Sequence, residues 1–125
     1  TALLAAPKNV NFWKSRTKIF YSFSSFDQQF NKAAIQALAQ AQILSPVDPK
    51  IAYNLAVLYG REGDNDKAIE LLNKAILWRP MYRDAVYALH VFYSEIKKPD
   101  DAKRVLLEYL ENVDPNDKDF QDRVK

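Results

Sequence analysis

The sequence contains no cysteine, only two glycines and a single histidine among its 125 residues. The lack of cysteine excludes disulfide frameworks, thiol nucleophiles and Cys-based zinc sites. His90, being alone, has no partner for a His-rich metal site. Two glycines are too few for the phosphate-binding loops of a Rossmann or P-loop enzyme, and neither GxGxxG nor GxxxxGK(S/T) occurs. We therefore expect neither a cofactor nor a metal ion.

Long hydrophobic runs are also missing. No stretch of 18 apolar residues occurs, so the sequence predicts no membrane-spanning helix. The chain begins at Thr1 without a signal-like segment, and we interpret it as part of a longer protein. What is present is a chain with 48% hydrophobic and 27% charged residues and a net charge of +2. This composition favours one folded domain over disorder, and it leaves the compartment open.

The charge pattern disfavours nucleic-acid binding. Residues 1–63 carry 7 basic and 3 acidic groups, and residues 64–125 carry 11 basic and 13 acidic groups, so the halves differ only mildly. No basic run exceeds Lys97-Lys98, and both signs are mixed along the predicted helices. This is the usual pattern of a solvated surface and not a stripe that follows phosphates.

Several residue types recur with a period of 34. Ala34, Ala68 and Ala102 are 34 residues apart, and the same step separates Leu38, Leu72 and Leu106, Leu55 and Leu89, Tyr59 and Tyr93, and Pro46 and Pro80. Five extra residues occur early, since Pro7 and Pro46 are 39 apart, and one occurs late. A fixed period of this length is the signature of a repeat architecture.

Within each unit the apolar residues follow the spacing of two amphipathic helices. Leu55, Leu58 and Tyr59 form one stripe, and Ala68, Leu71, Leu72 and Ala75 form another. Residues 60–64 contain both glycines and predict a tight turn between the two helices. Helix starts with an Asp cap and a first-position proline are predicted at Asp48-Pro49, Pro99-Asp100-Asp101 and Asp114-Pro115-Asn116-Asp117, and a helix end at Trp78-Arg79-Pro80.

The stretch from Tyr53 to Pro80 closely resembles the tetratricopeptide repeat (TPR). Small Ala56, Ala68 and Ala75 fall where that family packs one helix against another, and large Leu55, Tyr59 and Leu72 fall on its large apolar positions. The resemblance implies an all-α fold, a right-handed superhelical solenoid of antiparallel helix pairs. The implied units are a remnant of a preceding repeat at 1–9, repeats at 10–48, 49–82 and 83–116, and the start of a further or capping helix at 117–125.

The outer units depart from the family pattern. The third unit has His90 in place of a small residue and Lys97 in place of a turn glycine. The first unit has Arg16 in place of a large apolar residue and contains the five-residue insertion, within residues 23–30. Residues 12–30 hold 7 of the 16 aromatics, which favours an extended helix whose aromatics fill the core; a partner-docking patch is the alternative.

We find no catalytic constellation. His90 stands among Ala88, Leu89 and Val91, where a packed and hydrogen-bonded histidine is favoured over a general base. The loop from Asp114 to Asp119 lacks the sixth-position glycine of an EF-hand, so calcium binding is not expected. The sequence therefore predicts a domain that is not itself an enzyme, although a longer parent protein could be one.

The resemblance instead implies a binding surface on the first helix of each pair, along the concave face. There Tyr53 and Tyr87 recur one period apart, with positive charge at one end. This combination suits a peptide or protein segment with acidic and apolar groups. The candidate partner-binding residues are Lys14, Lys18, Lys50, Tyr53, Asn54, Val57, Arg61, Tyr87 and Val91. A groove without a specific ligand is the alternative.

One TPR subclass clamps acidic C-terminal chaperone peptides with Lys and Asn from its first two units and a basic pair from its third. Lys14 and Asn54 match two of these positions, but Asp84 and Ala88 stand where the basic pair belongs, so we do not expect this clamp.

A second resemblance involves the strings at residues 7–14 and 79–85, which look like the repeat region of bacterial O-antigen polymerase or ligase-like membrane proteins. It implies an extracytoplasmic accessory domain that contacts partner subunits or glycan, whereas a free-standing scaffold would be cytoplasmic. Self-association through exposed ends near Leu3 and Leu4 is also expected, because interior repeats need cover.

Overall fold

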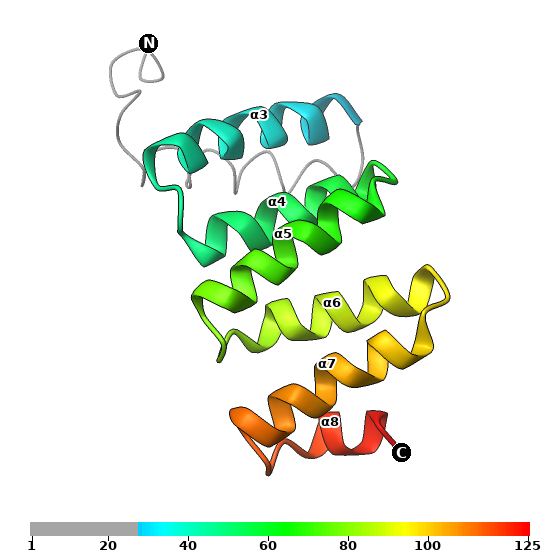
Figure 1. The fold of residues 1–125 in the computed structure, drawn as a ribbon. Coiled ribbons are helices and arrows are strands. Elements are labelled where there is room, and N and C mark those ends of the chain that lie inside the picture. Colours follow the sequence, from blue (N-terminus) through cyan, green and yellow to red (C-terminus); the bar gives the residue numbers. More distant parts are fainter. Residues whose placement is uncertain (1–27) are drawn as a thin grey trace.

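The structure, a computed structural model, describes residues 28–125, and this part of the chain contains helices and no strand. The helices are α3 (Gln28–Leu44), α4 (Pro49–Arg61), α5 (Asn65–Trp78), α6 (Arg83–Glu95), α7 (Pro99–Asn112) and α8 (Lys118–Arg123). Each helix packs against the next, and α4 also contacts α6. The chain therefore zigzags in one direction from α3 to α8 (Figure 1).

The helices form two layers. Residues of α4, α6 and α8 line one shared hollow. A second hollow lies between α3 and α5, and a third lies between α5 and α7, where Val86 and Leu89 of α6 also contribute to the lining. We call the surface of α4, α6 and α8 the inner face and the surface of α3, α5 and α7 the outer face. The arrangement is an all-α, right-handed superhelical solenoid of antiparallel helix pairs, as the sequence predicts.

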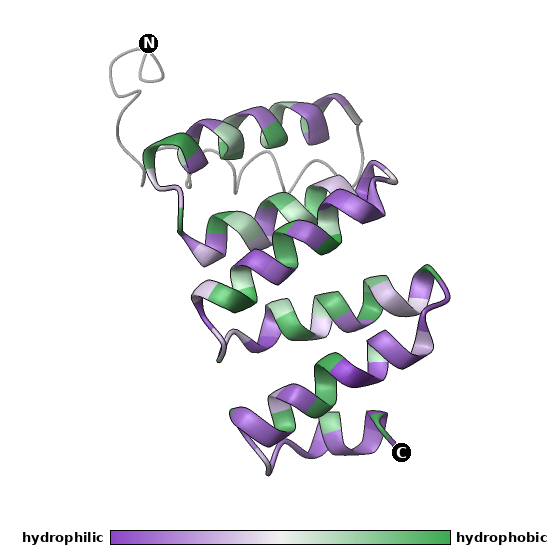
Figure 2. Cartoon of the chain, viewed as in Figure 1, coloured by the Kyte–Doolittle hydropathy of each residue, from purple (hydrophilic) through white to green (hydrophobic). Residues whose placement is uncertain are grey.

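Small side chains on the second helix of each pair allow the helices to approach closely. Ala34 and Ala68 are fully buried and Ala102 is 3% exposed, and each is followed four residues later by a fully buried leucine. Hydropathy colouring shows the corresponding stripes between neighbouring helices (Figure 2). Tyr109 is buried where the earlier units have Ala41 and Ala75. The larger ring packs edge-on against Phe120 of α8, with ring centroids 5.1 Å apart.

Two of the predicted helix starts need correction. Asp48 caps α4 as predicted, since its carboxylate accepts hydrogen bonds from the backbone N–H of Lys50 and Ile51. Pro99 is the first residue of α7, but the preceding Lys98 makes no side-chain cap. Asp114 does not cap α8; its carboxylate accepts from Asn116 in the loop, and Asp117 is the cap. Within the predicted start at Asp114-Pro115-Asn116-Asp117, the cap is therefore the last residue and not the first, and α8 begins at Lys118.

The turns after α4 and α6 have the same hydrogen bonds. Gly60 was predicted in the turn but belongs to α4, so Gly63 is the turn glycine, with φ of 86°. Its counterpart one period later is Lys97, with φ of 61°. In both turns the N–H of this residue donates to the carbonyl three residues back, and the N–H of the following residue donates to the carbonyl five residues back, which is the Schellman arrangement. Lys97 thus adopts a left-handed conformation that favours glycine.

Part of the sequence-based hypothesis lies outside the described residues. This holds for Arg16, the remnant at 1–9 and the aromatics of residues 12–26. Phe30, the last aromatic of that group, lies in α3 and is 39% exposed. The extent of the first repeat and the position of its insertion stay predictions.

Candidate partner-binding groove

The predicted site residues of the second and third repeats lie along the inner-face side of α4 and α6. On α4, Lys50 and Arg61 are exposed near the two ends, and Tyr53, Asn54 and Val57 are half-buried between them. On α6, Tyr87 and Val91 are half-buried, one turn apart. None of the seven belongs to the buried core, which the opposite sides of the helices supply. Lys14 and Lys18 are outside the described residues.

A hollow of about 190 Å³ brings Tyr53 and Tyr87 together. Its lining comes from α4, α6 and α8, and the residues are Tyr53, Arg83, Asp84, Tyr87, Ala88, Asp119 and Arg123. The sequence placed Tyr53, Asp84, Tyr87 and Ala88 on this face. Lys50, Asn54, Val57, Arg61 and Val91 lie on the same helices but do not line this hollow.

The aromatic side of the hollow extends to Tyr82. Its ring centroid is 5.3 Å from that of Tyr53, with the two planes tilted by 42°. Burial, and secondly the neighbouring Tyr53, raises the pKa of Tyr82 to about 12. On the other side of this ring, the guanidinium carbon of Arg79 is 5.2 Å from the centroid. Tyr82 therefore holds Tyr53 in place while its own hydroxyl stays neutral through the physiological range.

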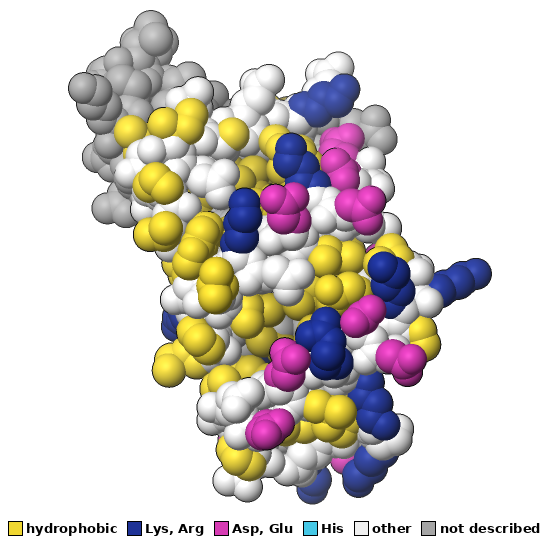
Figure 3. All heavy atoms as spheres, in the orientation of Figure 1, with side chains coloured by type: hydrophobic (Ala, Val, Ile, Leu, Met, Phe, Trp, Pro, Cys, Tyr) yellow, Lys and Arg dark blue, Asp and Glu magenta, His cyan; other side chains and the backbone are white. Residues whose placement is uncertain are grey.

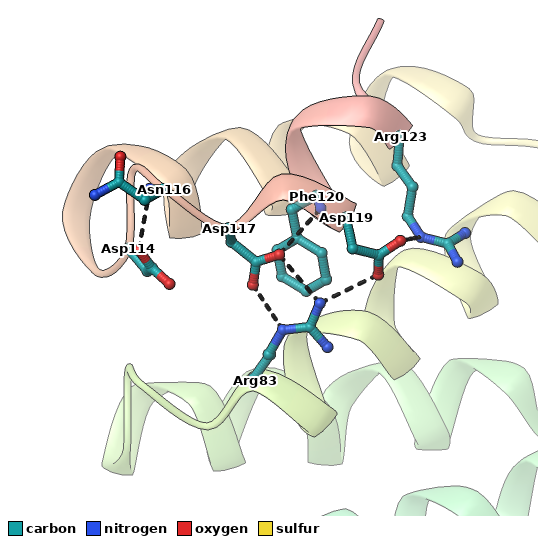
Figure 4. Close-up of polar contacts among 7 residues, drawn as sticks. All are labelled: Arg83, Asp114, Asn116, Asp117, Asp119, Phe120 and Arg123. Carbon is teal, nitrogen blue, oxygen red and sulfur yellow. Dashed lines mark hydrogen bonds and ion pairs between the residues drawn. The ribbon is translucent and has the colours of Figure 1, made fainter.

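The polar side of the hollow is built around Arg83 (Figure 4). Its Nε donates to Asp117 Oδ2 at 2.6 Å, and its Nη2 donates to Asp117 Oδ1 and to Asp119 Oδ2, each at 3.1 Å. The guanidinium also lies over the ring of Phe120, 4.3 Å from its centroid. The hydrogen bonds from Arg83 lower the pKa of Asp117, whose side chain is only 8% exposed. Arg83 thus fastens α8 onto α6.

Arg123 extends this network over Tyr87. Its Nε donates to Asp119 Oδ1 at 3.1 Å, and its guanidinium carbon is 4.8 Å from the Tyr87 ring centroid. Asp119 therefore binds both arginines, and α8 contributes two of the residues that line the hollow.

Sequence reasoning missed Arg83, Asp119 and Arg123. A signal existed, because Arg83 and Asp117 are one period of 34 residues apart, and so begin equivalent helices. What it could not show was that side chains from these two equivalent helix starts would pair with each other.

The single histidine and the acidic side chains form no further site in the described part of the chain. His90 Nδ1 is 2.8 Å from the carbonyl oxygen of Ala102, so the ring is tied to α7 as a packed histidine. Among residues 28–125, no group of three or more His, Cys, Asp or Glu side chains is arranged to hold a metal ion. No helix in this range is long and apolar enough to cross a membrane.

The profile of the tetratricopeptide repeat matches residues 26–90 and, in an overlapping second register, residues 60–122. The chain belongs to the tetratricopeptide-repeat family. The sequence resemblance is thereby confirmed, and with it the solenoid fold. TPR domains are in general non-catalytic modules of protein interaction, which agrees with the prediction of a domain that is not itself an enzyme. Among curated protein sequences, none is detectably similar to this TPR chain.

Solved structures with the same fold are 17–21% identical to this chain in sequence. Two crystal structures of MamA have TM-scores of 0.77 and 0.76 at 21% identity, and the thermophilic TPR protein TTC0263 from Thermus thermophilus has 0.77 at 18%. Each alignment covers 98% of this chain and 63–68% of the other. The first TPR of Spaghetti (RPAP3), bound to the HSP90 peptide SRMEEVD, has 0.72 at 19% identity and covers 93% and 90%.

These similarities concern the TPR fold. The resemblance to O-antigen polymerase or ligase-like proteins therefore stays a hypothesis from the sequence.

Proposed function

We propose that this TPR domain binds a peptide or protein segment in the groove on its inner face. The observation that carries the proposal is the hollow shared by Tyr53 and Tyr87, two aromatic side chains that recur one period apart on successive first helices. Both rings are half-buried, so each keeps an open side while its position is held by neighbours. Tyrosines held in this way offer a large contact area at little cost in conformational entropy.

The polar side chains that line the groove restrict which kind of peptide can bind there. Arg83 and Arg123 already bind the carboxylates of Asp117 and Asp119, so their charge is largely compensated within the domain. Asp84 adds a negative group to the same hollow. We therefore expect a segment that inserts apolar or aromatic side chains between the tyrosines, with its acidic groups toward exposed Lys50.

Neighbouring TPR structures give a useful contrast. The first and second TPR of Spaghetti are bound to the HSP90 peptide SRMEEVD, and the second TPR of human RPAP3 to the HSP70 peptide SGPTIEEVD. Their fold supports peptide binding as the function of this surface. In this chain Asp84 and Ala88 line the hollow at the positions where the basic pair of a carboxylate clamp is expected. We thus expect weak or no binding of SRMEEVD.

The proposal is tested by selecting peptides against the 125-residue chain from a random peptide library and measuring their affinity by calorimetry. Tyr53→Ala combined with Tyr87→Ala is expected to weaken binding about 100-fold, since each truncation of a central aromatic costs about tenfold. Leu107→Ala, on exposed surface of α7, is the matched control and should leave the affinity unchanged. Equal affinity of the double variant, with its helical circular dichroism intact, would refute the groove as the binding site.

A further inference from the structure

Four large apolar side chains protrude from two equivalent corners of the solenoid. Ile43 and Val47 flank the connection from α3 to α4 and are 69% and 65% exposed, and Leu77 and Met81 flank the connection from α5 to α6 and are 75% and 65% exposed. Both pairs recur one period of 34 residues apart. Figure 3 shows hydrophobic side chains gathered along this edge of the molecule, on the left. We call these four residues the apolar edge.

The third corner of the same chain shows that the fold does not require apolar side chains there. The connection from α7 to α8 has the same place in its repeat, yet Glu111 takes the position of Leu77. The one-residue shift follows α7, so Asn116 takes the position of Met81, and both Glu111 and Asn116 are exposed. Because a polar corner is compatible with this backbone, the first two corners expose their apolar side chains for another reason, and a contiguous exposed patch marks an interaction surface.

The outer face also contains a hollow beside this edge. It has a volume of about 400 Å³, lies between the end of α3 and the outer side of α5, and includes Pro46, Leu71 and Trp78 in its lining. Leu77 follows the lining residue Lys74 by three positions and precedes Trp78, so it stands at the rim of the hollow. The lining also includes Gln42, Lys67, Glu70 and Lys74, so a protruding apolar side chain stands beside a hollow with both apolar and charged walls.

We propose that the apolar edge binds a second copy of this chain through a two-fold axis. If this axis lies between the two corners, Leu77 of each copy enters the hollow of the other copy. The corner of Ile43 and Val47 in one copy then faces the corner of Leu77 and Met81 in the other. Each of the four side chains of the apolar edge then contacts an apolar side chain of the other copy, because the two corners carry equivalent residues of successive repeats.

The size of the apolar edge fits a reversible dimer. The four side chains expose on the order of 500 Å², against about 800 Å² that one partner contributes to a standard interface. The hollow and the residues at its rim contribute the rest of the area that such an interface buries.

Charge favours a second copy over a lipid surface. Arg79 is the one cationic residue within the stretches 43–47 and 77–81, and its guanidinium already lies over Tyr82. A membrane-binding edge would carry several lysines or arginines. The two lysines that line the hollow already have partners within the chain, since Lys74 pairs with Glu70 at 3.4 Å and Lys67 lies over the ring of Tyr59, so like charge does not oppose the approach of two copies.

Sedimentation equilibrium of the 125-residue chain over a range of concentrations tests the proposal. The wild type should move from one to two chain masses as the concentration rises. Leu77→Glu and Leu77→Lys should each raise the dissociation constant at least about 100-fold, because either charge would lose its water at the contact, and the lysine would also meet Lys67 and Lys74 in the partner's hollow. The matched control is Leu107→Glu, which places the same charge at an exposed leucine of α7 outside the edge and should leave the constant unchanged.

A second measurement checks the symmetry. The chain has no cysteine, so Ile43→Cys and Leu77→Cys each introduce a unique thiol. A short thiol cross-linker should join a mixture of the two variants more efficiently than either variant alone.

Three results would overturn the proposal: a monomer at all concentrations, a dimer that persists in Leu77→Glu, or a monomer that binds lipid vesicles through Leu77. A dimer that is lost in Leu4→Glu and kept in Leu77→Glu would instead assign association to the chain end.

Discussion

Gly60 of α4 lies directly under the ring of Phe92 of α6. A Cβ atom on Gly60 would overlap Cζ and Cε1 of that ring, so the two helices approach closely at this point because Gly60 has no side chain. Phe92 is itself half-buried and packed on the main core. Gly60→Ala therefore has two opposed effects on stability. It stabilises α4, because alanine is a better helix former than glycine, and it destabilises the fold, because the ring of Phe92 in α6 is displaced.

The two effects can be separated by size. Replacing a glycine inside a helix by alanine gains up to about 1 kcal/mol. Pushing a packed aromatic ring aside costs about 1–3 kcal/mol. We therefore expect Gly60→Ala to lower the free energy of unfolding by about 1 kcal/mol in the native chain. In a Phe92→Ala background the ring is gone, and the same change should raise the free energy of unfolding by about 0.5–1 kcal/mol. The sign of the effect reverses.

The assay is urea unfolding of the four chains of this double-mutant cycle, followed by circular dichroism. Ser94 serves as the control position, because it lies one period after Gly60 near the end of α6 and is exposed. Comparing Ser94→Ala with Ser94→Gly measures the helix preference without a ring above it. If Gly60→Ala changes stability equally in both backgrounds, the ring of Phe92 does not lie over Gly60 and the packing of α4 on α6 is wrong.

Two further predictions concern stability. Lys97→Gly should raise the free energy of unfolding by about 1 kcal/mol in the same assay, because Lys97 has a positive φ, while Gly63→Ala in the equivalent turn should lower it by a similar amount; a loss in Lys97→Gly would contradict this turn geometry. The lowered pKa of Asp117 means that its contribution is present above its ordinary pKa of 3.8 and is lost as the pH falls through the lowered value. Acid unfolding followed by circular dichroism should therefore show a steeper loss of stability in the wild type than in Arg83→Met, and identical slopes would argue against the Arg83–Asp117 pair.

The alanines and leucines of the 34-residue period show how far sequence reasoning reaches. Ala34, Ala68 and Leu72 were identified from spacing alone, and all are fully buried. Helical periodicity and the need for small residues at helix crossings are properties of a single unit and its immediate neighbour, so they can be read along the chain. The cap at Asp48 was found for the same reason.

Sequence reasoning was incomplete where a helix boundary depends on packing beyond the local sequence. The predicted start at Asp114-Pro115-Asn116-Asp117 contains two aspartates that could cap the helix, and the structure uses Asp117, which caps α8 and also binds Arg83. Gly60 has the form of a turn residue, but it belongs to α4 and accommodates Phe92. In both cases the helix boundary depends on a contact with a residue about 30 positions away, and a local sequence pattern does not contain that contact.

By itself the sequence determined the repeat, its helix pairs and the face on which Tyr53 and Tyr87 lie. Only the tertiary structure decided that α8 folds back onto α6, so that Arg83 and Arg123 join the hollow and Asp119 links them. The tertiary structure also decided that Leu77, which lies off the apolar stripe of Ala68, Leu71, Leu72 and Ala75, is not covered by any other helix within residues 28–125: it is 75% exposed. The reason is that periodicity assigns a side chain to a face of its helix, whereas burial depends on what packs against that face.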